Sequence, residues 1–126
     1  VERFVEVNDL VETNIVGAMN SNFAFYSGLI NGGGMAGEVS EDQILSDVWS
    51  QEPDIRQSTT EWVYSFLLLA YEPLEADELE TYITYSETDA GQDLNSALFV
   101  AFDKVFERIS RNLGTASAQF MAQQEL

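Results

Sequence analysis

The chain has 126 residues, 45% of them apolar, and its 22 acidic and five basic side chains give a formal net charge of −17. It contains no cysteine and no histidine, which excludes disulfides, thiolate and imidazole metal sites, and catalysis by a Ser-His or Cys-His pair. The acidic balance argues against partners such as a nucleic-acid backbone or an anionic membrane surface.

The length and apolar content predict one domain with one buried core. The longest apolar run covers only residues 66–71, far short of a transmembrane helix. The chain does not begin with Met, and residues 1–5 already look like the interior of a helix. We therefore expect residues 1–126 to be a single all-helical domain, cut from a longer precursor, so the lack of a signal peptide says nothing about export.

A first helical region is predicted from Phe4 to Asn31, because apolar or small residues recur there every three or four positions. The polar run 20–22 interrupts this pattern and predicts a kink or a break. The three glycines at 32–34 cannot sustain a helix, so we expect a loop over residues 32–39. The positions that carry the pattern are Phe4, Val7, Val11, Ile15, Ala18, Phe25 and Leu29.

Two further helices are marked by their starts. Ser40 and Gln43 form a capping box that predicts a short helix, closed before Pro53. Pro53 then suits the first turn of the next helix. Leu68 and Leu69 make that helix apolar nearly all round near its end, so we expect it to be the central, most buried helix or to face a partner. Its inner face is predicted to hold Ile55, Thr59, Trp62, Val63, Phe66, Leu67 and Ala70.

The last part of the chain predicts two or three more helices. One spans residues 75 to about 87, after Pro73 ends the preceding helix. A long helix then runs from Thr88 to Gly114, where we expect it to end, and a final short helix holds Phe120 and Met121. No segment has the period of a strand, so the fold class is an all-α bundle of five or six helices. The predicted inner face of the long helix holds Leu94, Ala97, Leu98, Ala101, Phe102, Val105 and Ile109.

The junction before the long helix is predicted to be a structural helix corner formed by Thr88, Gly91 and Gln92. The Thr88 hydroxyl can accept a hydrogen bond from the backbone N–H of residue 90 or 91. Gly91 lowers helix propensity in the first turn, and close packing against the preceding helix is a plausible reason for it.

In residues 74–121, a Glu78-Leu79 pair and an aromatic Tyr85 precede Thr88, Gly91 and Gln92 at the start of the long helix. This pattern resembles the bacterial family called domain of unknown function 2059. Its members have a helix with a Glu-Leu pair and an aromatic residue, followed by a Ser/Thr-Pro-x-Gly-Gln turn into a long helix. Asp89 stands where the family commonly has proline. The resemblance implies an all-helical fold and export to the periplasm, and it implies no catalytic residue. The matching positions are Glu78, Leu79, Tyr85, Thr88, Gly91 and Gln92.

The charged residues are unevenly distributed, with no basic residue between Arg56 and Lys104. Two carboxylates from the 72–93 region can perform acid–base chemistry if burial separates their pKa values, which makes a hydrolase one hypothesis. A solvated acidic helix surface explains the same residues more simply. Lys104, Arg108 and Arg111 share one helical face, as an anion-binding patch or as a complement to the helix dipole. We expect no metal and no cofactor.

The residues that point most clearly to function are apolar. Phe99 and Phe106 lie seven residues apart on one face of the long helix, off its main stripe. Either the inner face is wide, or a second apolar face meets another protomer or a ligand. Together with Leu68, these two residues are our candidates for an interface.

We therefore expect a non-enzymatic periplasmic module that acts by binding an unknown protein partner or by self-association, for example as a homodimer. This hypothesis fails if Leu68, Phe99 and Phe106 are all buried within a monomer. One alternative is a carrier for an apolar ligand, which needs a cavity of roughly several hundred Å³. The others are the hydrolase and a mimic of nucleic acid that displays carboxylates to a basic partner.

Overall fold

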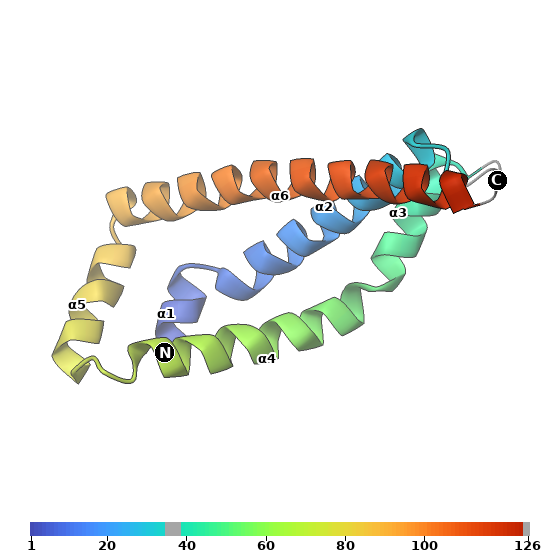
Figure 1. Ribbon diagram of the computed structural model, residues 1–126. Coiled ribbons are helices and arrows are strands. Elements are labelled where there is room, and N and C mark those ends of the chain that lie inside the picture. Colours follow the sequence, from blue (N-terminus) through green and yellow to red (C-terminus); the bar gives the residue numbers. More distant parts are fainter. Residues whose placement is uncertain (35–38, 125–126) are drawn as a thin grey trace.

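The computed structural model describes residues 1–34 and 39–124, and this part of the chain forms six α-helices and no strand (Figure 1). The all-α bundle of five or six helices is thus confirmed. Half of the loop expected over 32–39 lies outside the described residues. None of the described helices combines the length and the apolar character needed to cross a membrane. The helices are α1 (Glu2–Val7), α2 (Leu10–Asn31), α3 (Glu41–Ser50), α4 (Glu52–Tyr71), α5 (Ala76–Ser86) and α6 (Asp89–Gln124).

The central helix is α2, which lies between α4 and α6 and also contacts α1 and α3 (Figure 1). Of the two alternatives for α4, the most buried helix is wrong, because only Val63 and Leu67 of α4 are buried, and a helix that faces a partner stays a prediction. The small residues of α2, among them Gly17, Ala24 and Gly28, allow neighbouring helices to approach it from more than one side.

The break expected at residues 20–22 is also wrong, since α2 is continuous from Leu10 to Asn31. The chain breaks earlier, at Asn8 and Asp9. The Asn8 side-chain amide donates to the Phe4 carbonyl oxygen at 2.9 Å, and Asp9 has a φ of 49°, in the left-handed region. Asn and Asp occupy such positions because their short polar side chains compete locally for backbone hydrogen bonds.

The local signals for helix starts are confirmed. The Ser40 hydroxyl accepts a hydrogen bond from the Gln43 backbone N–H at 3.2 Å, which caps α3. Pro53 lies in the first turn of α4. At the start of α5, where the sequence indicated acidic residues but no cap, the Glu78 carboxylate accepts a hydrogen bond from the Glu75 backbone N–H at 2.9 Å.

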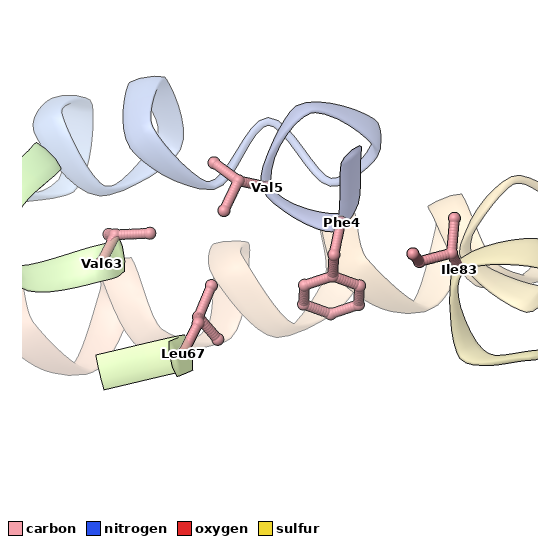
Figure 2. Close-up of a cluster of buried hydrophobic side chains, with 5 residues drawn as sticks. All are labelled: Phe4, Val5, Val63, Leu67 and Ile83. Atoms are coloured by element: carbon pink, nitrogen blue, oxygen red, sulfur yellow. The ribbon is translucent and has the colours of Figure 1, made fainter. Parts of the chain in front are cut away.

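Two clusters of buried apolar side chains form the core. The first joins α1, α4 and α5 and is drawn in Figure 2. The Phe4 ring in this cluster meets the Tyr71 ring edge-on, with 5.3 Å between centroids. The second joins α2 and α3. No residue of α6 belongs to either cluster. The buried members are Phe4, Val5, Val63, Leu67 and Ile83 in the first, and Ile15, Met19, Ile44 and Val48 in the second.

Helix α6 does not end at Gly114, and the separate final helix predicted after it is wrong. α6 continues to Gln124 because Gly114 lies directly against α2. A Cβ atom on Gly114 would lie 2.1 Å from the Phe25 carbonyl oxygen, and a Cβ atom on Gly28 would lie 2.1 Å from the Arg111 carbonyl oxygen. The two glycines therefore permit a close approach of the two backbones. This packing offsets the cost of about 1 kcal/mol that glycine carries in a helix.

Two arginines form ion pairs between helices that are distant in the sequence. Arg3 of α1 pairs with Glu80 at 2.6 Å and with Glu87 at 2.7 Å. Arg56 of α4 pairs with Glu12 of α2, and this guanidinium lowers the pKa of the Glu12 carboxyl below its usual value. The pairs are exposed, so they orient the helices more than they stabilise them.

The contact between α2 and α6 predicts the effect of Gly28→Ala. In a solvated helix this change stabilises by about 1 kcal/mol, but here the new methyl group overlaps backbone atoms, and we expect a loss of roughly 3 kcal/mol. Gly17→Ala is the matched control, because its Cβ would meet only the movable Asp103 carboxylate. Urea unfolding measures both variants. Equal or higher stability of Gly28→Ala contradicts the close approach.

A second prediction concerns Tyr71, whose pKa is raised to about 12 by burial first and by the neighbouring Tyr82 second. The pKa of an unfolded tyrosine is about 10, so the fold favours the neutral phenol. This stabilisation is complete below about pH 10 and is lost as the pH rises through about 10 to 12. Tyr71→Phe removes one late phenol ionisation from an ultraviolet titration and makes the unfolding free energy fall less steeply in that window. An unchanged titration curve contradicts the assignment.

Candidate functional site

The largest helix of the protein turns its large apolar side chains outward. Leu94, Leu98, Phe102, Val105 and Ile109, which the sequence placed on an inner face, are between 42% and 54% exposed. The buried residues of α6 are small: Gly91, Gly114 and Ala118. We call the six exposed residues Leu94, Leu98, Phe102, Val105, Ile109 and Leu113 the α6 apolar face.

Beside this face, a groove that we call the aromatic trough runs between α6 and α4, over α2. One part of it is a hollow of about 440 Å³ between α2 and α6. Two smaller hollows extend it to α4, and all three share Asn14 of α2. The trough has a floor of Asn14, Gly17, Ala18 and Ser21 from α2, one wall of Phe99, Phe102, Asp103 and Phe106 from α6, and a second wall of Trp62 and Phe66 from α4.

Both walls of the trough carry stacked aromatic pairs at a spacing of four residues. The Phe102 and Phe106 rings are 6.2 Å apart at an interplanar angle of 24°, and the Trp62 and Phe66 rings are 5.4 Å apart at 16°. Residues four apart lie on the same side of a helix, so each wall presents a continuous aromatic surface. The floor between them is made mainly of small or polar side chains of α2, among them Thr13, with Leu10 as the one large apolar residue.

The three interface candidates from the sequence are not brought together. Phe99 and Phe106 line the same hollow, where Phe106 is 53% exposed and Phe99 is half-buried. Leu68 is 59% exposed but lines none of the hollows of the trough.

Three aromatic residues of the trough are not among the interface candidates from the sequence. Trp62, Phe66 and Phe102 follow the apolar period of their helices, and this period predicts an inner face. The aromatic pairs at i and i+4 were the signal that could have identified them.

Asp103 is the one charged side chain of the trough. It is half-buried, and its Oδ1 atom lies 2.7 Å from the point that a Cβ atom on Gly17 would occupy. Within residues 1–34 and 39–124, its carboxylate takes part in no hydrogen bond and no ion pair. Gly17 thus leaves the space in which this carboxylate sits among the three phenylalanines of α6.

The helix corner holds α1, α5 and α6 together and lines none of the described hollows. The Thr88 hydroxyl accepts a hydrogen bond from the Gly91 backbone N–H at 3.1 Å. A Cβ atom on Gly91 would lie 2.2 Å from the Tyr85 carbonyl oxygen, so only glycine fits there. The Gln92 amide donates to the Ser86 carbonyl oxygen at 2.6 Å and to that of Val7 at 2.9 Å.

The acidic residues of the 72–93 region give the hydrolase hypothesis no support. All eight are exposed, and none lines a described hollow. Among the residues that the structure describes, no group of three or more acidic side chains is placed to hold a metal ion. Lys104, Arg108 and Arg111 are exposed and form no ion pair with the described part of the chain. The eight acids are Glu72, Glu75, Asp77, Glu78, Glu80, Glu87, Asp89 and Asp93.

Comparison with known proteins adds no relative: no family model matches the chain, and neither a curated protein nor a solved structure does. The resemblance to the domain of unknown function 2059 family stays a prediction. The trough and the α6 apolar face are therefore the features of this protein that bear on its function.

The exposure of the α6 apolar face predicts that polar substitutions there are tolerated. The double variant Leu98→Gln and Ile109→Gln should keep its free energy of unfolding within about 1 kcal/mol, because surface changes typically cost less than about 0.5 kcal/mol each. Ile15→Gln, in the second core cluster, is the control and should lose roughly 3 kcal/mol or more. Urea unfolding compares them. A loss in the double variant similar to that of the control contradicts the open face.

Proposed function

We propose that this protein is a non-enzymatic interaction module that binds a helix of a protein partner in the aromatic trough. The single observation that carries the proposal is the orientation of α6, which packs on α2 with small residues and presents its large apolar ones to solvent. The resemblance to an exported family supports a periplasmic location, which is part of the proposal.

Six large apolar side chains exposed along one helix need a physical reason. Soluble monomers seldom keep contiguous apolar patches beyond a few hundred Å², and larger ones mark sites of interaction. The trough and the α6 apolar face adjoin along α6 and share Phe102. A net charge of −17 opposes aggregation, so the protein can keep such a surface open until a partner covers it.

The shape of the trough favours a helix as the occupant. An apolar groove between two helices is a common receptor for an amphipathic helix, which anchors itself with residues at i, i+3, i+4 and i+7. Helices pack with their axes about 8–10 Å apart when the side chains at the contact are small enough. The floor residues Gly17, Ala18 and Ser21 meet this condition, and the aromatic walls supply the apolar contact.

The volume of the main hollow favours a second candidate function, a carrier for an apolar ligand. Small-molecule sites typically have about 300–1,000 Å³, and the hollow of about 440 Å³ lies in this range. A small ligand would contact only the wall formed by α6. A bound helix would contact both walls, and this difference separates the two candidates experimentally.

A designed peptide tests the proposal with the protein's own tryptophan as reporter. The peptide forms about five helical turns, with leucine and alanine on one face and glutamine on the other. In a Trp49→Phe background only Trp62, on the α4 wall, reports binding. We expect the Trp62 emission to shift on binding, and Phe106→Ala to weaken the affinity at least about tenfold, since a buried aromatic anchor is a typical hot spot.

Phe120→Ala is the matched control, because Phe120 is also exposed on α6 but lies outside the trough. It should leave the affinity unchanged. No binding of the peptide, or equal effects of the two alanine variants, contradicts the proposal. Binding of a free fatty acid in calorimetry that leaves the Trp62 emission unchanged, together with no binding of the peptide, supports the carrier instead. Light scattering after size exclusion, at low and moderate salt, shows whether a second copy of the chain takes the place of the partner.

A further inference from the structure

We infer that the helix bound in the aromatic trough is a basic one, and that one of its arginine or lysine side chains docks on Asp103 between the phenylalanines of α6. This inference rests on the proposed function and adds the chemistry of the partner to it. Under this inference, Asp103 determines the preference for a helix that carries a positive charge.

The position of Asp103 carries the argument. Its carboxylate is half-buried beside Gly17, with three phenylalanine rings lining the same hollow. A helix that covers the trough removes the remaining water from this carboxylate. An uncompensated carboxylate in an apolar contact is costly, so the bound helix must supply a positive charge or a set of hydrogen-bond donors at this point.

The aromatic surroundings favour a cation. Phenylalanine faces attract ammonium and guanidinium groups, and the attraction grows when water is excluded. Phe102 and Phe106 are stacked side by side, so a planar guanidinium can lie against them while it hydrogen-bonds the carboxylate. Thr13, Asn14 and Ser21 at the floor provide no positive charge.

None of the five basic side chains, all of which the structure describes, forms an ion pair with Asp103. Arg3 and Arg56 are paired with glutamates elsewhere. Lys104 follows Asp103 directly, which places it about 100° further round the helix. Arg108 and Arg111 follow five and eight positions later, on the same side as Lys104 and away from the trough.

Charge complementarity identifies the partner as basic rather than as a second copy. A second copy brings a further net charge of −17 to a surface that already carries an unpaired carboxylate. A basic amphipathic helix is attracted to the acidic protein before contact and neutralises Asp103 after it.

Three versions of the designed peptide test this inference. They carry arginine, citrulline or glutamate at one position beside the leucine face, and citrulline differs from arginine in lacking the charge. We expect the affinity to decrease in that order, with arginine about tenfold above citrulline. Asp103→Asn should remove the difference between arginine and citrulline and leave the citrulline affinity within about twofold. Asp93→Asn, an equal loss of charge at an exposed site on the same helix, should keep it.

The outcomes separate the two levels of the argument. Equal affinities for arginine and citrulline peptides, with Phe106→Ala still harmful, overturn the basic partner and leave the proposed function standing. Failure of every peptide to bind overturns both. A dimer in light scattering that Asp103→Asn weakens identifies a second copy as the occupant, and this result also overturns the basic partner. A difference that Asp93→Asn removes as completely as Asp103→Asn shows a general charge effect and contradicts the specific role of Asp103.

Discussion

The contact between the backbones of α2 and α6 determines most of what is unusual in this protein. Gly28 and Gly114 leave no side chain between the two helices, so each backbone lies against a carbonyl oxygen of the other. The Thr115 hydroxyl of α6 adds a hydrogen bond to the Gly28 carbonyl oxygen of α2. Because only small residues fit where the two backbones are closest, bulky apolar side chains of α6 such as Leu94, Leu98 and Ile109 remain exposed. The exposed apolar face is therefore a direct consequence of the close packing.

The same constraint shapes the trough. A helix that packs closely on α2 stands beside it as a wall, and α4 forms the other wall on the opposite side (Figure 1). The part of α2 that remains uncovered carries Asn14, Gly17 and Ala18, which are too short to fill the space. The result is an apolar groove on a strongly acidic protein, with the half-buried Asp103 inside it. The apolar walls of the groove thus select a partner by its shape, and Asp103 selects it by the sign of its charge.

The features that depend on neighbouring residues, such as helix starts, could be predicted from the sequence. The features that depend on contacts between distant helices could not. Ser40 with Gln43, and Pro53, identified helix starts correctly because caps and first turns are local structures. Periodicity located the apolar stripe of α6 but could not say whether that stripe meets the protein or the solvent. From its neighbours in the sequence, Gly114 is predicted to end a helix. In the fold it is the point where α6 packs on α2, and this depends on Phe25, which lies on another helix. The trough was predictable only in part, through Phe99 and Phe106, since its second wall comes from a helix that is far away in the sequence.

The absence of α6 from both core clusters has a consequence for the synthesis of the protein. Every buried member of the two clusters lies within residues 4–83, so the ribosome has already made all of them when α6 follows. Until α6 is complete, α2 lacks the helix with which it makes its most extensive contact. The contact that buries Gly114 and Ala118 can form only after that point.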